Sequence, residues 1–320
     1  MFLQILQFQI ADFPQSVYQC SLLYIHKSFL YTCFHKRSDY IKQNTLQISF
    51  NKDDSWIILS PIEQSIKHKI ESVGTPLKDW NIRINRGILT GYNEAFIIDK
   101  AKRNELIEQD PKSAEIIRPI LRGKDIRRYS YDFANKYLIT TYNEYTDSNE
   151  IKHPSININD YPAVKKHLDC YWNEINKRQD KGDTPYNLRR CAYMDDFNKP
   201  KIAWNRIASK KSFGLIDEGI YIQDSMHFIT GENIEYLAAT LNSSLFIWLM
   251  NSIVGESAGG NAGNADNVKN LRILKPTNEI DCKITELLKN NDSESIDRLI
   301  NQLYLLTEEE IQFISSSVKL

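Results

Sequence analysis

The alternation of apolar and polar positions predicts a chain that mixes short strands with helices. Apolar residues recur at intervals of three and four along several segments, as one face of a helix requires, which predicts helices at residues 61–73, 100–109, 113–121, 162–178, 234–250 and through most of 276–320. Alternating or continuous apolar runs predict strands at residues 82–84, 95–98, 136–142, 201–207, 213–217, 220–230 and 268–274. Glu218 and Gly219 predict a tight hairpin between the runs 213–217 and 220–230. The expected fold class is α+β, a mixed domain with short sheets and a helical C-terminal part.

Local capping signals mark the start of two of these helices. Ser60, Pro61 and Glu63 combine a cap hydroxyl, a proline at the first helical position and a glutamate that can reach back to the cap amide. Thr307 and Glu310 repeat the cap and the glutamate near the C-terminus. Both helices are therefore expected to begin at these residues.

Two stretches rich in glycine and arginine organise the middle of the chain, residues 80–99 and 116–129. In the first, glycines separate two predicted strands, and Arg83 and Arg86 stand at the mouth of the resulting turn. In the second, Gly123 follows a predicted helix and is surrounded by arginines and a lysine. Because glycine lets the backbone approach a partner and arginine binds phosphates and base edges, both stretches favour contact with nucleic acid.

The formal net charge of −1 conceals a local asymmetry. Residues 80–130 hold eleven Lys or Arg against seven Asp or Glu, and residues 199–211 hold five basic and no acidic residues. From residue 277 onward, nine acidic residues face four basic ones. A basic middle and an acidic tail favour a polyanion that binds the middle only, although ordinary scatter of surface charge explains the same totals.

The cysteines and the N-terminus exclude other classes of protein. The five cysteines are widely spaced, with no CxxC pair and no histidine placed to complete a zinc site. The N-terminal segment MFLQILQFQI is apolar, but glutamines interrupt it and it is too short to span a membrane. The sequence therefore predicts a cytoplasmic protein with reduced thiols and no metal centre.

Several phrases of the sequence resemble one family. The phrases RGILTGYNEAFIID and IIRPILRGKDIRRY are followed, in the same order, by YPAVKKHLD, RQDKGDTPYNLRRC, KIAWNRI, LAATLNSSLF and IDRLINQLYLLTEEEIQFI. Together they resemble the TaqI-like C-terminal specificity domain. This domain is the target-recognition region of type IIG restriction-modification enzymes and related adenine-specific DNA methyltransferases. The resemblance extends from about residue 50 to the end of the chain.

The resemblance implies three parts. Residues 1–50 look like the end of a methyltransferase domain with a linker, residues 51–275 like the DNA target-recognition domain, and residues 276–320 like a C-terminal helical segment. It also implies double-stranded DNA as the partner and a catalytic region, upstream or in a separate methyltransferase or endonuclease chain, that uses S-adenosylmethionine. No cofactor is expected in this chain itself.

The catalytic motifs of such enzymes are missing from the sequence. An adenine-specific methyltransferase holds its flipped base with an Asn-Pro-Pro-Tyr or Asp-Pro-Pro-Tyr motif, and none of the ten prolines here is adjacent to another. No glycine-rich turn follows a clear strand and opens a helix, as S-adenosylmethionine binding requires. This chain alone is not expected to transfer methyl groups.

Two other functions stay open. Asp195 and Asp196, followed by Lys199 and Lys201, are the nearest approach to the carboxylates and lysine of a metal-dependent nuclease. Adjacent acids point apart on a strand, so a role in capping a turn competes with this interpretation. Alternatively, the acidic helical tail docks a separate methyltransferase, and the chain is a protein-interaction subunit.

Under the DNA-recognition hypothesis, arginine and asparagine read base edges, while lysine and backbone amides hold phosphates. The candidates are Arg83, Arg86, Gly87, Thr90, Gly91, Asn93, Arg122, Lys124, Arg127, Arg128, Asn205, Arg206, Lys210, Lys211 and Ser212. Some have a structural alternative, since Arg122 can pair with Asp125, and turn geometry alone explains Gly87 and Gly91. The run 210–212 has no acidic neighbour and favours phosphate contact. No catalytic or metal-binding residue is assigned.

Overall fold

The computed structural model of the chain describes residues 5–6, 45–46, 59–206, 212–254 and 263–318. It divides into two compact units, Met1–Ser65 and Ile66–Leu320. In the first unit, β1 (Ile5–Leu6) pairs antiparallel with β2 (Thr45–Leu46). Helix α2 (Pro61–Val73) begins there with the predicted capping box, because Glu63 accepts a hydrogen bond from the Ser60 amide at 2.7 Å and Ser60 Oγ accepts one from the Glu63 amide at 3.4 Å.

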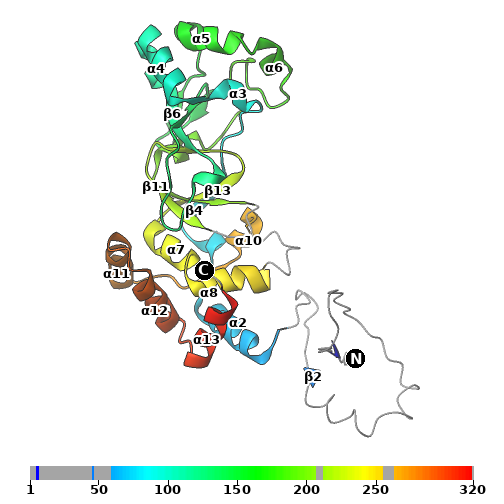
Figure 1. Ribbon diagram of the computed structural model, residues 1–320, viewed down its shortest axis with the longest axis vertical. Coiled ribbons are helices and arrows are strands. Elements are labelled where there is room, and N and C mark those ends of the chain that lie inside the picture. Colours follow the sequence, from blue (N-terminus) through cyan, green and yellow to red (C-terminus); the bar gives the residue numbers. More distant parts are fainter. Residues whose placement is uncertain (1–4, 7–44, 47–58, 207–211, 255–262, 319–320) are drawn as a thin grey trace, which may run out of the picture. The chain divides into compact units, whose positions relative to one another are not determined.

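The second unit contains two four-stranded sheets (Figure 1). The first sheet is antiparallel throughout and has the order β11 (Phe213–Ile216), β10 (Lys201–Asn205), β13 (Met226–Gly231), β4 (Ile82–Arg86). Directly opposed residues point to the same face, so Arg86, His227 and Trp204 share one face of this sheet. Phe228 and Ala203 share the other.

The second sheet has the order β12 (Tyr221–Ile222), β6 (Ile117–Leu121), β7 (Lys136–Ile139), β5 (Ile97–Asp99), with β12 parallel to β6 and the other pairs antiparallel. Its apolar residues, among them Ile120 and Leu138, form one buried cluster with Phe228 and Ala203 of the first sheet. Burial of each large apolar side chain contributes about 1.5–3 kcal/mol, so this shared core stabilises both sheets.

Helices on one side of the second unit complete this core. Leu106 of α4 (Lys100–Gln109), Leu168 of α5 (Pro162–Asp169) and Ile175 of α6 (Trp172–Lys177) are buried in it. The remaining short elements around the two sheets are β3 (Thr75–Pro76), η2 (Leu77–Asp79), α3 (Asn93–Phe96), η3 (Pro111–Glu115), η4 (Gly123–Asp125), β8 (Tyr145–Thr146), β9 (Lys152–His153), η5 (Ile158–Asp160) and η6 (Met194–Asn198).

Helix α7 (Ile234–Leu241) packs on β10, β11 and β13 of the first sheet, and α8 (Ser244–Leu249), continued by the π-helical turn η7 (Met250–Val254), packs on α7. The Asn242 side chain fixes the contact of α7 with β11, because it donates to Phe213 O at 2.7 Å and accepts from Phe213 N at 3.0 Å. After α10 (Ala265–Lys269) and β14 (Arg272–Ile273), helices α11 (Asn278–Lys289), α12 (Ser293–Leu303) and α13 (Glu308–Ser317) pack on α7 and α8 (Figure 1).

Among the described residues, no single helix has both the length and the apolar character needed to cross a membrane. The pair Ile234–Leu241 and Ser244–Val254 meets that test only when taken together, and it bends by 60° at the break.

The α+β fold class with a helical C-terminal part is confirmed. The helix at residues 100–109 and the capping box of Thr307 and Glu310 are also confirmed, with Glu310 accepting from the Thr307 amide at 2.7 Å. Strands predicted at 136–142 and 201–207 form as the shorter β7 and β10. The confirmed helix, capping box and strands were each predicted from signals within a few neighbouring residues.

Several predicted elements are wrong. Residues 113–121 form η3 and strand β6 in place of a helix, because Pro119 lacks the amide that a helix interior needs and the apolar run pairs with β7. Residues 95–98 are divided between the short helix α3 and β5, which lies in a different sheet from β4. Residues 268–274 contain the end of α10 and only a short strand, β14.

Two further predictions joined elements that the structure separates. The predicted hairpin at Glu218 and Gly219 does not form, since β11 pairs with β10 while β12 joins β6 in the other sheet. The helices predicted at 162–178 and 234–250 are each broken, the second at Ser243, whose hydroxyl caps the start of α8.

Candidate nucleic-acid interface

One end of the first sheet gathers candidate residues from segments far apart in the sequence. Arg86 ends β4 and lies opposite His227 in the sheet register. Asn205 ends β10, and the Arg206 amide donates to Ser225 O at 3.2 Å just before β13 begins. Antiparallel pairing therefore places Arg86, Asn205 and Arg206 at a common edge, here called the sheet end. His227 itself is buried and packs 5.6 Å from the Trp204 ring, as a core histidine would.

Arg86 is fixed at the sheet end by Asp224. Its Nε donates to Asp224 O and its Nη2 lies against Asp224 Oδ2, each at 3.1 Å. The next residue is Gly87. A Cβ at this position would lie only 2.1 Å from Gln223 O, so a larger residue does not fit. Close packing against the backbone of Ile222 and Gln223 thus accounts for this glycine.

The loop 122–130 packs beside the sheet end. A Cβ on Gly123 would lie 2.0 Å from Asn205 Oδ1, so this glycine makes room for the Asn205 side chain. Arg122 forms two 3.0 Å contacts with Asp125, from Nε and Nη2, so the predicted pairing of these residues is confirmed, although on a 3-10 turn and not on a helix. Lys124 is exposed beside this pair.

The end of this loop has internal partners as well. Arg127 donates to Lys124 O at 2.7 Å and pairs with Asp132 at 2.7 Å. Arg128 lies over the Tyr129 ring, 5.0 Å from its centroid, and 3.8 Å from Asp297 on α12. The structure thus brings the second basic stretch to the sheet end through Gly123 and Lys124, whereas Arg128 turns toward the C-terminal helices.

Arg83 lies on the opposite face of β4 from Arg86. It contacts Asp196 Oδ1 at 3.3 Å, and Asn85 donates to Asp196 Oδ2 at 2.7 Å. Lys199 adds a third contact at 2.9 Å, and Asp196 is fully buried. Its carboxylate therefore serves as the centre of an internal ion-pair network. Among the residues that the structure describes, no cluster of three metal-ligating side chains surrounds it or any other position.

The turn at residues 90–93 is organised by an arginine that the sequence pattern did not single out. Arg178 is buried, donates to Thr90 O, to Pro185 O at 2.7 Å and to Asn187 O at 2.9 Å, and lies over the Phe96 ring. Thr90 is itself buried and donates to Asn93 Oδ1 at 2.7 Å, while Gly91 has a positive φ of 69° that glycine adopts without strain. Of the third basic run, Ser212 is partly buried, and Lys210 and Lys211 lie outside the described residues.

A hollow of about 300 Å³ next to Arg86 was not predicted. It is lined by Arg86, Gly87, Ile88, Leu89, Arg189, Arg190, Cys191, Ala192 and Tyr193, and is here called the arginine cleft. Burial raises the pKa of the Cys191 thiol to about 11 and that of the Tyr193 hydroxyl to about 12, so both are neutral at physiological pH. The adjacent Arg189 and Arg190 in the phrase RQDKGDTPYNLRRC were the sequence signal that could have indicated this cleft. Nothing in the sequence, however, links them to Arg86.

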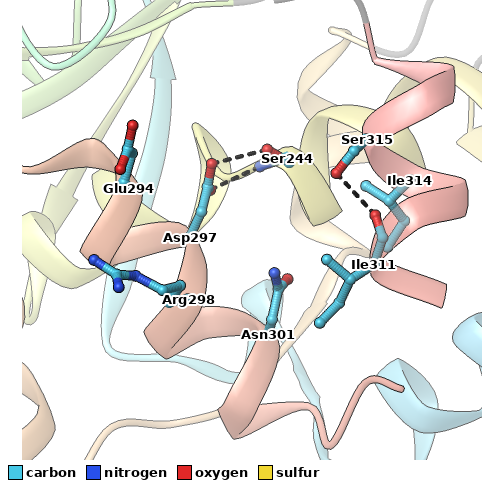
Figure 2. A pocket seen from close by; sticks show the side chains of 8 residues that line it. All are labelled: Ser244, Glu294, Asp297, Arg298, Asn301, Ile311, Ile314 and Ser315. Carbon is cyan, nitrogen blue, oxygen red and sulfur yellow. Dashed lines mark hydrogen bonds between the residues drawn. The ribbon is translucent and has the colours of Figure 1, made fainter. Parts of the chain in front are cut away.

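A second hollow, of about 310 Å³, lies between α8, α12 and α13, and Figure 2 shows its lining. Asp297 accepts hydrogen bonds there from the Ser244 amide at 3.0 Å and the Ser244 hydroxyl at 2.8 Å. Ser315 donates to Ile311 O within its own helix. The bonds between Ser244 and Asp297 join α8 to α12, and none of the candidate residues lines this hollow.

Comparison with known proteins finds one family. Residues 118–262 match the model of the TaqI-like C-terminal specificity domain, so this segment of the chain is similar to that family. The segment contains the loop 122–130, Arg189, Arg190 and the sheet-end residues Asn205 and Arg206. No curated protein matches the chain.

Two solved structures are similar at low sequence identity. The type IIL restriction-modification enzyme MmeI, solved in complex with DNA, matches 76% of this chain and 36% of its own chain, with a TM-score of 0.48 and 12% identity. The type IIG restriction endonuclease BpuSI matches 76% of this chain and 32% of its own, with a TM-score of 0.43 and 13% identity. The chain thus spans about a third of the length of either enzyme.

Proposed function

We propose that this chain is the double-stranded DNA recognition module of a restriction-modification system. In this role it positions DNA for an adenine-specific methyltransferase or endonuclease whose catalytic residues lie outside it. The observation that carries the proposal is the match of residues 118–262 to a family of specificity domains. That segment holds most of the candidate DNA-contacting residues.

The chemistry of the sheet end supports the proposal. Arginine and asparagine side chains can each make paired hydrogen bonds to a base edge, and both occur there as Arg86 and Asn205. Lys124, exposed on the adjoining loop, suits a phosphate. Residues that both read and position DNA would thus come from separate segments held by one sheet.

Methyl transfer is assigned to the partner region and not to this chain. Gly231 is the glycine where β13 leads into α7, the kind of connection at which a nucleotide cofactor can bind. A Cβ at Gly231 would lie 2.4 Å from Asn81 O, so protein backbone already fills this position. The described residues therefore do not fit S-adenosylmethionine there, and the proposed partner would bind it.

Fluorescence anisotropy with labelled duplex DNA tests the proposed function. The logarithm of the association constant is expected to fall linearly with the logarithm of salt concentration, with a slope of about −0.9 for each phosphate contacted. Binding between about 50 and 200 mM salt would accordingly weaken strongly. Failure of the purified chain to bind any duplex in low salt would contradict the proposal. Metal-dependent cleavage of the DNA by the chain alone would favour the nuclease alternative.

A further inference from the structure

We propose that the arginine cleft binds one deoxyribose-phosphate unit of the DNA backbone, with Arg189 and Arg190 holding the phosphate. This inference rests on the proposed DNA-recognition function and names a contact site within it. None of the nine residues that line the cleft is acidic, and three are arginines. The remaining lining is mostly apolar or backbone, including Ile88, Leu89 and Ala192. The arginines can bind a phosphate, and the apolar wall beside them can pack against the adjoining sugar.

Arg189 and Arg190 are available to a ligand. Their side chains are 60% and 71% exposed. Among the described residues, Arg189 contacts Asp180 alone, through Oδ1 at 3.2 Å. Arg190 directs both Nε and Nη2 at one oxygen of Asp183, at 3.1 and 2.6 Å. Each guanidinium therefore keeps further N–H donors that no described residue accepts, and these can bind phosphate oxygens.

The existing ion pairs of these arginines are weak competitors. Exposed salt bridges contribute only about 0–1 kcal/mol, because water and side-chain entropy offset the attraction. Asp183 also accepts a hydrogen bond from Ser155 at 2.7 Å, so it keeps a partner when Arg190 turns away. A DNA phosphate can thus draw Arg190 from Asp183 at small cost.

Arg86 lines one side of the cleft with a side chain that Asp224 holds in place. Its two contacts with Asp224 hold the guanidinium at the boundary between the cleft and the sheet end. A backbone bound in the cleft would therefore run beside the residues proposed to face the bases. The cleft also combines residues 189–193, inside the matched family segment, with residues 86–89, outside it.

The role of Cys191 and Tyr193 in the cleft is binding and not chemistry. With pKa values raised to about 11 and about 12 by burial, neither group offers an anionic nucleophile at neutral pH. Neither one adds a negative charge that would repel a phosphate. The neutral walls add no negative charge to that of the carboxylates already paired with the arginines, Asp224, Asp180 and Asp183.

The test compares the intact chain with the double variant Arg189→Gln/Arg190→Gln in anisotropy titrations against several unrelated duplexes. A phosphate site predicts a loss of about tenfold in affinity at low salt, equal for all duplexes, and a salt slope that is shallower by about 0.9 for each phosphate no longer neutralised. Asp183→Asn, which removes the competing charge, is expected to raise affinity severalfold. Arg298→Gln, a change of an exposed arginine on α12 that donates to Ser295, is the matched control and should leave binding unchanged.

Each outcome separates the two proposals. If the unchanged chain binds no duplex, the proposed function fails and the cleft fails with it. If the chain binds with a steep salt slope and the double variant binds equally well, only the cleft assignment is overturned. A loss confined to some duplex sequences also overturns it, because that result assigns base reading to these arginines. Circular dichroism and urea unfolding of the double variant, expected to match the intact chain, exclude a folding defect as the cause.

Discussion

Arg178 and Arg190 lie on one connection between α6 and η6, yet their surroundings are opposite. Arg178 is buried and gives its donors to the backbone carbonyls of Thr90, Pro185 and Asn187. Arg190 is 71% exposed and, in the part of the chain that the structure describes, donates to a single carboxylate oxygen, Asp183 Oδ1. The difference teaches that partners and burial, and not position in an arginine-rich phrase, separate an arginine that holds the fold from one that can bind a ligand.

Replacing Arg178 tests the structural side of this contrast and should have the largest effect. Arg178→Met keeps the aliphatic length but removes the guanidinium donor of the Thr90, Pro185 and Asn187 carbonyls, of which Asn187 O keeps a second donor, the Gly182 amide at 3.1 Å. Each buried carbonyl left without a donor costs about 1–3 kcal/mol, so the free energy of unfolding is expected to fall by at least about 2 kcal/mol. Urea unfolding followed by circular dichroism measures this change.

The matched control is Arg190→Met on the same loop. Its free energy of unfolding should change by less than about 0.5 kcal/mol, as expected for an exposed ion pair. Equal losses of stability for the two variants would abolish the distinction between them.

Asp196→Asn probes an intermediate case, a buried acid with partly exposed basic partners. Arg83 and Lys199 are 57% and 37% exposed, so water can solvate them when the carboxylate charge is removed. The expected loss of stability is about 1–3 kcal/mol, mainly from the charge-assisted hydrogen bonds, again by urea unfolding. Asp195→Asn, at a more exposed carboxylate, should cost less. Loss of a metal-dependent DNA cleavage activity on Asp196→Asn, with stability unchanged, would instead support the nuclease alternative.

Gly123→Ala tests whether this glycine is present for packing. The new methyl group would meet the Asn205 amide, which must shift away, and the expected cost is about 1–2 kcal/mol in thermal or urea unfolding. Combining it with Asn205→Ala should restore part of that loss, because the shorter side chain leaves the space. Additive effects of the two changes would show that the contact is not the cause.

The sequence was most informative where a signal is local. Both capping boxes and the helix at 100–109 formed as predicted, because a cap depends on residues three positions apart. Pairing partners were not local: β12 and β11 are neighbours in the chain, but they belong to different sheets. The pattern alone could not reveal this, since an apolar run fits either sheet equally well.

The residues of the candidate site also fall into those that a local signal predicted and those that only the tertiary fold brings together. Arginines in glycine-rich phrases pointed to the sheet end, where Arg86 and Asn205 end strands on either side of β13, with their side chains on opposite faces of the sheet. Arg83 came from the same phrase and faces away, because neighbouring strand positions alternate between faces. The arginine cleft could not be predicted, because Arg86 and Arg190 meet only through the tertiary fold.

Lys201→Met is expected to change the pH dependence of the free energy of unfolding least near neutral pH. It extends the comparison of buried and exposed arginines to a buried lysine. Its side chain is fully buried and donates to Asp217 O and Ile220 O, each at 3.2 Å, and desolvation lowers its pKa to about 8. Between about pH 8 and the unfolded pKa near 10.5, the unfolded chain binds more protons at this residue than the folded chain. The contribution of Lys201 to the free energy of unfolding therefore rises with pH in this window and is flat below it. Unfolding titrations of the intact chain and Lys201→Met from about pH 7 to 10 should show their stability difference shifting toward the intact chain as pH rises. A difference independent of pH would mean that the buried amine titrates like an exposed one, and that burial does not set the behaviour of basic residues in this protein.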